Sequence, residues 1–381
     1  MSRYHSYLNS AKEILSVYKG DEPFASFLKK YFSQHKKFGS RDRKQISHLC
    51  YCYFRLGKAL TDLPIEEKIL TGLFLCSSEA NEILSLLKPE LNEKITLFLQ
   101  EKLSSINFQL SFLFPWKEEL SKGIDHEKFC GSFFQQPDLF LRLRPGKENV
   151  AKEKLKKANV DFKMISGSCL ALDNSTKIDP IVELDKEAVV QDYNSQQIQE
   201  FFPGKITRVW DCCAGSGGKS IMLYDINPQI ELTVSDIRES ILANLKKRFK
   251  QAEVKNYRSY TLDLTKNPKD HIGNFDLIMT DVPCTGSGTW SRTPEQLFYF
   301  DDRSIEQFNN LQKKIVSNVM PHLQPRGYFL YITCSVFKKE NEEVVELIKE
   351  RFNLELIKSE VLKGYDKKAD SMFATLLRKK L

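Results

Sequence analysis

The chain has 381 residues, of which 41% are hydrophobic and 28% are charged, and its formal net charge is +7. This composition is ordinary for a folded protein and argues against a disordered, collagen-like or coiled-coil chain, and no apolar run approaches the ~20 residues that span a bilayer. The modest basic excess permits a nucleic-acid partner without requiring one. At roughly 150 residues per domain, the length predicts two or three domains.

Cysteine usage and the N-terminal sequence indicate the cellular compartment in which the protein is expected. The nine cysteines are an odd number, and no two of them have the Cys-x-x-Cys spacing that is typical of zinc sites. Residues Met1–Leu8 contain neither an apolar segment nor a small-residue cleavage site. We therefore expect a cytoplasmic protein with reduced thiols, no metal and no membrane partner, and we expect it to be a monomer.

The first third of the chain has the periodicity of amphipathic helices. Phe24, Phe27, Leu28, Tyr31 and Phe32, for example, share one helical face. Helical patterns lie at residues 4–15, 24–32, 46–53, 65–75, 79–87 and 91–101. Because no strand pattern of useful length appears before residue 138, we expect an all-α domain over residues 1–125.

A different pattern begins at Pro137. Leu139–Arg144 is typical of a strand and is followed by Pro145-Gly146, which indicates a turn. A charged helix is expected at Asn149–Ala158, with extended segments at 161–165 and 169–172. These elements predict a small α+β module within residues 126–200.

Strand and helix patterns alternate from Ile206 onward. Strands are expected at 206–210, 232–234, 275–279 and 328–332, with a further strand ending at Asp263, and helices at 238–250, 303–320 and 340–351. This alternation predicts an α/β domain over residues 201–381, with a mostly parallel sheet covered by helices on both faces. Ligands of such sheets bind at the carboxyl ends of the strands.

The first of these strands is followed by a glycine-rich segment, Asp211-Cys-Cys-Ala-Gly-Ser-Gly-Gly-Lys-Ser220. The dinucleotide pattern fails because Ser220 stands where the third glycine is required, and the P-loop pattern fails because Cys213 stands where its first glycine is required. A strand, an acid, a loop of small residues and a helix, in this order, are typical of S-adenosylmethionine sites. An ordinary tight turn is the alternative.

Two acids follow the next strands. Asp236 ends the second strand, where a carboxylate can accept hydrogen bonds from a ribose, although it is also a favoured helix N-cap. Asp263 follows the third strand, where it can meet an adenosine or serve as a turn residue. Both acids are candidate cofactor residues.

The fourth and fifth strands are each followed by a cysteine. Asp281 ends the fourth strand three residues before Cys284, and Cys334 follows the fifth strand. A single cysteine here would be read as a small buried hydrophobe, but two at one sheet edge favour a chemical role. Cys212 and Cys213 are expected nearby, yet no histidine stands at ligand spacing, so we expect no zinc.

Three motifs, taken in order, resemble one family. Asp211-x-Cys-Ala-x-x-Gly-Gly-Lys219, Asp281-x-Pro-Cys-x-Gly-x-Gly288, and Tyr331-x-Thr-Cys-Ser335 followed by Glu340-Asn-Glu-x-x-Val345 are similar to the Sun/Fmu (RsmB-like) RNA cytosine-C5 methyltransferases. Shorter segments that look like the family are Gln191-Asp192-x-x-Ser195, Arg292-x-Pro294 and Asp370–Ala374. In the N-terminal domain, Arg41-Asp-Arg43 and Cys50–Arg55 are similar to the NusB-like RNA-binding domain of such enzymes.

The resemblance implies a Rossmann-like, S-adenosylmethionine-dependent methyltransferase domain, a small ferredoxin- or RRM-like RNA-binding module and a NusB-like bundle. It implies cofactor contacts from Cys213, Ala214, Gly215, Ser216, Gly217, Gly218, Lys219, Asp236, Asp263 and Asp281. The substrate it implies is RNA, with small-subunit (16S) rRNA expected before tRNA, and rRNA processing as the role.

The resemblance also assigns the catalytic residues. Cys334 is the nucleophile that attacks C6 of cytosine, which makes C5 able to take a methyl group. Asp281 holds the N3 and amino edge of the base, and Cys284 assists release of the product. The target base has to leave its stack to reach such a site.

The sequence departs from the family at several positions. The family loop reads Cys-Ala-Ala-Pro-Gly-Gly-Lys, whereas this chain has Gly215 and Ser216 in its centre, which predicts a more flexible loop. The family's arginine five residues after the ribose acid is replaced by Ile241, and Arg238 is a possible substitute. Arg142-Leu-Arg-Pro145 stands where the family often has Arg-Val-Asn.

Three other functions stay open. A tRNA cytosine-C5 methyltransferase has the same chemistry, and a DNA cytosine-C5 methyltransferase takes its nucleophile from a Pro-Cys motif, here Cys284. A non-catalytic assembly factor is favoured by the altered loop. For RNA contacts, Lys36-Lys37 and Arg41–Lys44 are better candidates than the run Lys246–Lys250, which is expected to be a solvated helix face.

Overall fold

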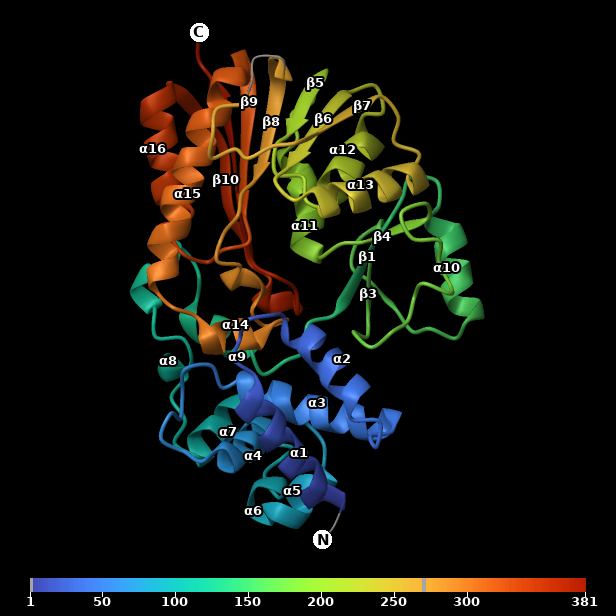
Figure 1. Ribbon diagram of the computed structural model, residues 1–381, viewed down its shortest axis with the longest axis vertical. Helices are drawn as coiled ribbons and strands as arrows, with labels where there is room; N and C mark the ends of the chain where they lie inside the picture. The colour runs from blue at the N-terminus through green and yellow to red at the C-terminus, as the bar shows by residue number, and fades with distance from the viewer. Residues whose placement is uncertain (1–2, 269–271) are drawn as a thin grey trace. The chain divides into compact units, whose positions relative to one another are not determined.

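The computed structural model describes residues 3–268 and 272–381 and divides into two compact units (Figure 1). The first unit, which we call the helical unit, comprises residues 1–118, 125–136 and 290–301. The second, the sheet unit, comprises residues 119–124, 137–289 and 302–381. The domain boundaries expected at residues 125 and 200 stay a prediction.

The helical unit confirms the expectation of an all-α N-terminal region. Its helices are α1 (Arg3–Val17), α2 (Phe24–Gln34), α3 (Ser40–Phe54), α4 (Ile65–Cys76), α5 (Glu82–Leu87), α6 (Pro89–Asn92), α7 (Leu99–Ser105), α8 (Leu110–Leu113), α9 (His126–Ser132) and α14 (Pro294–Tyr299). The single helix expected at 91–101 is wrong, because α6 ends at Asn92 and α7 begins at Leu99. Among residues 3–268 and 272–381, no helix has the length and apolar character that crossing a membrane requires.

Residues 290–301 belong to the helical unit although they follow the Pro-Cys motif in the chain. The side chain of Glu295 accepts a hydrogen bond from the backbone N–H of Phe24 at the start of α2. The ammonium of Lys58 donates to the carbonyls of Phe298 and Phe300, at 2.7 and 2.9 Å. Buried backbone groups of the insert are thereby satisfied, which fixes its place among the helices.

The packing of α3 against α4 gives a stability prediction. A Cβ on Gly72 would lie 2.2 Å from the carbonyl oxygen of Cys52. Because this oxygen belongs to the backbone, no change of side-chain rotamer can relieve the clash. Gly72→Ala should therefore lower the free energy of unfolding by about 2–3 kcal/mol, despite alanine's higher helix propensity. Urea denaturation measures this loss. Gly131→Ala is the matched control, since its Cβ meets only Leu99 at an ordinary 3.4 Å; equal losses in both variants would contradict the steric reason.

The sheet unit contains a small α+β module. Its elements are β1 (Leu139–Leu143), α10 (Glu148–Lys157), β2 (Lys163–Met164), β3 (Cys169–Leu172) and β4 (Ala188–Val190). These four strands, counted among the described residues, form one antiparallel sheet in the order β2-β3-β1-β4. The expected α+β character is confirmed, whereas β4 was not expected, and residues 173–187 between β3 and β4 contain turns and no helix.

The main sheet confirms the Rossmann-like α/β expectation. Its strands are β5 (Arg208–Asp211), β6 (Glu231–Asp236), β7 (Tyr257–Thr261), β8 (Phe275–Asp281), β9 (Leu323–Thr333), β10 (Leu354–Leu362) and β11 (Met372–Lys379). Their order is β10-β11-β9-β8-β5-β6-β7, and Figure 1 shows β9, β8, β5, β6 and β7 following one another in this order. Strands β5 to β9 pair in parallel, whereas β11 lies antiparallel to both β9 and β10. The sheet is thus mixed, because an antiparallel pair that the sequence analysis did not predict completes one edge.

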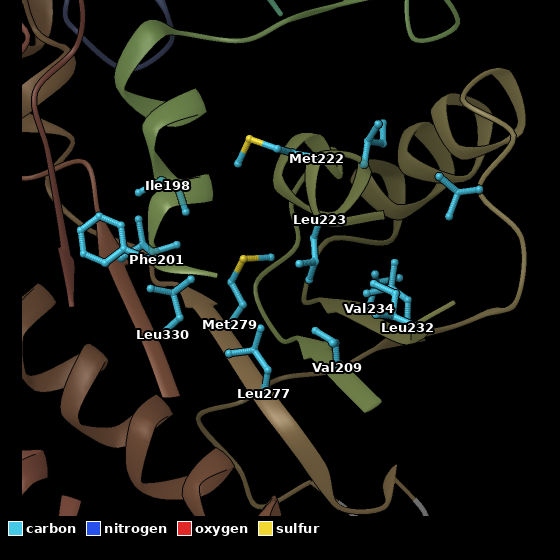
Figure 2. Packing of buried hydrophobic residues seen from close by; sticks show 14 of the residues in the cluster. Ile198, Phe201, Val209, Met222, Leu223, Leu232, Val234, Leu277, Met279 and Leu330 are labelled. Carbon is cyan, nitrogen blue, oxygen red and sulfur yellow. The ribbon is translucent and has the colours of Figure 1, made fainter. Parts of the chain in front are cut away.

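Helices cover both faces of this sheet. Its helices are α11 (Tyr193–Gln197), α12 (Gly218–Ile226), α13 (Glu239–Gln251), α15 (Arg303–Val319) and α16 (Glu342–Phe352), with short 3₁₀ turns η1 (Lys117–Glu119), η2 (Ile198–Phe201), η4 (Ser287–Thr289), η5 (Met320–His322) and η6 (Tyr365–Lys367) in the chain. Neighbouring strand residues point to opposite faces. Val209 belongs to the core cluster with α12 and α13, and Trp210 to the cluster with α15 and α16. Figure 2 shows Met222 and Leu223 of α12 in the first of these cores.

Candidate active site at the carboxyl edge of the sheet

A cavity of about 780 Å³ lies at the carboxyl ends of the parallel strands. Most of the expected site residues line it: Cys213, Ala214, Gly215, Ser216, Gly218, Lys219, Asp236, Asp263, Asp281, Cys284 and Cys334. Gly217 does not line the cavity. Instead it has φ +83°, and a Cβ there would lie 2.7 Å from the ring of Phe249, so this glycine permits the turn and its packing on α13.

The glycine-rich loop is held by the neighbouring strand β6. The N–H of Ala214 donates to the carbonyl of Ser235 at 2.9 Å, and the N–H of Gly215 donates to Oδ2 of Asp236 at 3.0 Å. At Gly215, which has φ +53°, a Cβ would meet nothing within 4 Å. The backbone of the loop is therefore open to the cavity, and α12 starts directly after it, with its free N–H groups near the loop.

Asp211, at the end of β5, is buried at 1% exposure. Its Oδ2 accepts a hydrogen bond from the Ser220 hydroxyl at 2.6 Å, but its Oδ1 has no hydrogen-bond partner among the residues that the structure describes. Burial raises the pKa of Asp211 to about 7, with a further contribution from the charge of Asp281. The Oδ1 atom of Asp211 is thus a polar atom next to the loop that is available for a hydrogen bond with a ligand.

This raised pKa predicts a pH dependence of stability. The folded state holds the Asp211 proton up to about pH 7, whereas the unfolded state releases it near pH 4, so stability falls as the pH rises through this window. Asp211→Asn removes the titration. Relative to that variant, the wild-type free energy of unfolding should be greater by ~2–4 kcal/mol at about pH 4.5 than at about pH 8. Denaturation of both proteins at the two pH values measures the difference, and a constant difference would contradict the assignment.

The two further acids are held in different ways. Burial raises the pKa of Asp236, but hydrogen bonds from the side chain and the N–H of Arg238 outweigh it, so the net pKa is lowered. Arg238 thus pairs with the acid, where the sequence analysis named it as a possible substitute for the family's arginine. Asp263 accepts hydrogen bonds from the hydroxyl and the N–H of Thr265, which lower its pKa. Asp263 is therefore both a turn residue and a cavity residue.

Lys219 and Asp281 form an ion pair inside the cavity, with Nζ 2.7 Å from Oδ2. Burial lowers the pKa of the Lys219 ammonium, but the charge of Asp281 and the hydrogen bond to it outweigh burial, so the net pKa is raised. The charge of Cys334 as a thiolate contributes in the same direction. The structure thus places a cation from the glycine-rich loop beside the carboxylate that ends β8.

The two cysteines expected at the strand ends are brought together. Their Sγ atoms lie 3.1 Å apart, Cys284 coming from the loop after β8 and Cys334 from the end of β9. The hydrogen bond to Cys334 and burial raise the pKa of Cys284 well above its usual value. Within the described ranges 3–268 and 272–381, no group of three or more potential metal-ligating side chains is found.

Buried polar side chains join the two cysteine loops. Glu340, which is fully buried, accepts hydrogen bonds from the hydroxyl and N–H of Thr285, from the hydroxyl of Ser335 and from the amide of Gln312. Thr285 and Ser335 directly follow the two cysteines. The N–H of Gly288 also donates to the carbonyl of Cys334 at 2.8 Å, and a Cβ on this glycine would lie 2.0 Å from the Ser371 carbonyl. The three segments can approach only with glycine at 288.

Sequence reasoning gave no role to several residues that line the cavity. Gln191, Asp192 and Ser195 precede the main sheet, and Asp370 and Met372 lead into β11. The sequence analysis found these segments similar to the family, but it did not predict that they line the cavity. Arg248, assigned with its neighbours to a solvated face, also lines the cavity. That interpretation is wrong for Arg248, whereas Lys246, Lys247 and Lys250 are exposed.

The sequence model of a family described as 16S rRNA methyltransferase RsmB/F matches residues 200–377. The matched segment, slightly less than half of the chain, is similar to that family. It contains the glycine-rich loop, both cysteines and Glu340. Its first residue lies shortly after the small α+β module, and the helical N-terminal region lies outside the match.

Individual relatives agree with the family match. A ribosomal RNA small subunit methyltransferase B from Klebsiella pneumoniae is 32% identical over 163 residues, which are 41% of this chain and 36% of that protein. The chain thus spans little more than a third of the length of this curated relative. The crystal structure of PH0851 superposes with a TM-score of 0.73 at 17% identity, covering 99% of this chain and 98% of that one. A methyltransferase homolog protein from Pyrococcus horikoshii superposes with a TM-score of 0.58 at 19% identity, covering 73% and 98%. These two likenesses show the fold.

Proposed function

We propose that this protein is an S-adenosylmethionine-dependent RNA cytosine-C5 methyltransferase that acts on small-subunit rRNA through a covalent cysteine adduct. One observation carries the proposal: Cys284 and Cys334 face each other at 3.1 Å in the cavity that the glycine-rich loop and Asp281 also line. A cofactor loop alone supports many methyl transfers. Two thiols beside a carboxylate favour a reaction in which carbon is attacked by sulfur.

The cavity fits S-adenosylmethionine. Its volume of about 780 Å³ lies within the usual range of small-molecule sites. The open backbone at Gly215, the buried Asp236 at the end of β6 and the unpartnered Oδ1 of Asp211 offer donors and acceptors along one wall. Asp236, Asp263 and the loop 213–219 would hold the nucleoside and amino-acid parts, and the chemistry that the bound cofactor supplies is an electrophilic methyl group.

Three residues of the chain have separate roles in the reaction of the cytosine base. The thiolate of Cys334 forms a bond to C6 of cytosine, which turns C5 into an enamine-like carbon. Asp281, fixed by Lys219, holds the N3 and amino edge of the ring and stabilises the charge of the adduct. After C5 is methylated its proton passes to solvent water, and the electron pair of that bond expels Cys334 from C6 as a thiolate. Cys284, whose raised pKa keeps it protonated at neutral pH, assists this release by directing its S–H at the departing sulfur 3.1 Å away.

RNA is the proposed partner, and looped or single-stranded RNA is the natural form because the base has to leave its stack. In the helical unit, Lys36, Lys37, Arg41, Arg43 and Lys44 are exposed and supply positive charge for phosphates. We assign a NusB-like RNA-binding role to this unit and an RNA-binding role to the small α+β module. In that module, Arg142 and Arg144 pair with Asp225, so they do not serve as the phosphate contacts.

The experiment that tests the proposal uses labelled S-adenosylmethionine and protein-free small-subunit rRNA, followed by sequencing for 5-methylcytosine. The expected result is methylation at a single cytosine. Methylation of tRNA alone would replace the substrate and keep the chemistry. Cofactor binding without methylation of either RNA, or no cofactor binding, would overturn the proposal and favour an assembly factor.

A further inference from the structure

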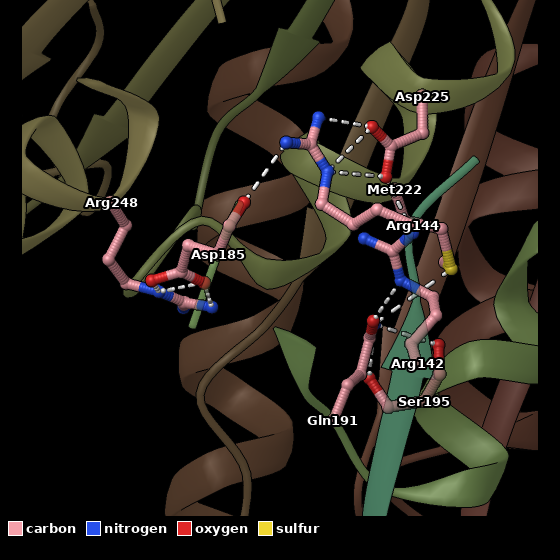
Figure 3. Close-up of polar contacts among 8 residues, drawn as sticks. All are labelled: Arg142, Arg144, Asp185, Gln191, Ser195, Met222, Asp225 and Arg248. Atoms are coloured by element: carbon pink, nitrogen blue, oxygen red, sulfur yellow. Dashed lines mark hydrogen bonds and ion pairs between the residues drawn. The ribbon is translucent and has the colours of Figure 1, made fainter. Parts of the chain in front are cut away.

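Arg248 of α13 joins the glycine-rich loop to the small α+β module. Its Nη1 donates to both the carbonyl and the hydroxyl of Ser216, each at 2.9 Å. Its Nε and Nη2 donate to the carboxylate of Asp185, with the shortest contact at 2.6 Å. Figure 3 shows this pairing of Arg248 with Asp185. One guanidinium thus binds the loop on one side and the module on the other.

The anchor of this arginine is itself fixed. Asp185 is buried, and its backbone carbonyl accepts a hydrogen bond from Nη1 of Arg144 at 3.0 Å. Arg144 and Arg142 both pair with Asp225 at 2.6 Å, and Asp225 lies on α12, the helix that begins at the loop (Figure 3). The loop is therefore flanked by two buried ion-pair connections to the same module.

The loop needs such a restraint. Ser216 stands between Gly215 and Gly217, which have φ values of +53° and +83°. Glycines in this region lose the most conformational freedom on ordering. A serine at position 216 does not restrict its own φ as a proline would. Here the loop lacks that internal restraint, and the guanidinium contacts Ser216 from outside.

We propose that Arg248, anchored by Asp185, is a positioning residue that holds the loop 214–218 in its cofactor-binding conformation. It replaces the missing rigidity of the loop and makes the small module part of the cofactor site. The role of Arg248 in cofactor binding rests on the proposed function. Its restraint on the conformation of the loop is independent of that function.

An alternative is that Arg248 serves as a contact for an RNA phosphate. The hydrogen bonds of Arg248 disfavour a phosphate contact, because Nε, Nη1 and Nη2 all donate to Ser216 or Asp185. Its side chain is 16% exposed. Lys247, the preceding residue, is exposed on the same helix, so its charge is open to solvent. Arg248→Met and Lys247→Met therefore form a matched pair that removes one positive charge each.

The first experiment is hydrogen–deuterium exchange of the cofactor-free protein, read in the peptide that covers residues 212–220. Arg248→Met should speed exchange there by about tenfold, the effect of losing a hydrogen bond to a charged group. Lys247→Met should leave it unchanged. Since Arg248→Met leaves the buried Asp185 unpaired, the double variant Asp185→Asn/Arg248→Met removes that charge as well and should show the same faster exchange. Unchanged exchange in the double variant would overturn the inference.

The second experiment measures affinity for S-adenosylhomocysteine by calorimetry. Arg248→Met and Arg248→Lys should both weaken binding by about tenfold. Methionine has no donor, and the single ammonium of lysine cannot donate to Ser216 and Asp185 at once as the planar guanidinium does. Lys247→Met should bind like the wild type. If the wild type itself fails to bind, the proposed cofactor is wrong, while the exchange result still decides whether Arg248 positions the loop. Normal affinity in Arg248→Met would overturn the positioning role.

Discussion

Cys334→Ala is expected to abolish methyl transfer to RNA, with a loss of at least ~10⁴-fold in turnover, because it removes the proposed nucleophile that forms the bond to C6. Affinity for S-adenosylhomocysteine should stay within about twofold, since the role proposed for this sulfur is attack on the base and not cofactor binding. A single-turnover assay with labelled cofactor measures the first effect and calorimetry the second. Cys76→Ala, at the end of α4 in the helical unit, is the control that removes a thiol outside the site.

Cys284→Ala should give a different defect. The adduct to Cys334 forms, but its release is slowed, so a covalent protein–RNA complex should accumulate and appear as a shifted band on a denaturing gel. The physical reason is the raised pKa of Cys284, since the hydrogen bond to Cys334 and burial keep the Cys284 proton in place. The reverse pattern, with complete failure only in Cys284→Ala, would make Cys284 the nucleophile, as in the DNA enzymes.

The positions of the candidate site residues at one edge of the sheet could be predicted from the sequence. Asp211, Asp236 and Asp281 each end a parallel strand, and parallel strands present their carboxyl ends at one edge. Once the strands were recognised, the placement of these acids followed. Cys284 and Cys334 followed by the same rule, and their contact at 3.1 Å is the structural outcome of that shared edge.

The antiparallel pair β10 and β11 was not predicted. Leu354–Leu362 lies at the sheet edge with most of its side chains exposed or half-buried, and it contains two glutamates and one lysine, which favour helices as readily as strands. Such a segment becomes a strand only because β11 offers it a partner. Tertiary pairing of this kind leaves little trace in local periodicity.

The role of Arg248 was hidden for a related reason. In the run Lys246–Lys250 the charges look equivalent, and a basic helix face is ordinarily solvated. The partners of Arg248 lie far off in sequence, Asp185 before the main sheet and Ser216 in the loop. Only the fold distinguishes this arginine from Lys247. A sequence shows which side chains carry charge, but not which of them find a buried partner.

Glu340→Gln is expected to destabilise the protein and to impair catalysis together. The carboxylate of Glu340 accepts four hydrogen bonds from three residues, at 2.6 to 3.0 Å, and its burial is complete. A glutamine would turn an N–H₂ group towards donors, leaving at least two buried polar groups unsatisfied. The loss in free energy of unfolding should be about 3–5 kcal/mol, as for breaking a buried charged network.

Glu343→Gln is the matched control for this loss, since Glu343 is exposed at the start of α16 and should change stability by less than ~0.5 kcal/mol. The link to catalysis is geometric, because Thr285 and Ser335 are the residues next to the two cysteines. In a variant that is still folded, relaxed spacing of the thiols should slow single-turnover methylation while cofactor affinity is kept, as measured by calorimetry. Full activity with lowered stability would show that Glu340 supports the fold without setting the thiol geometry.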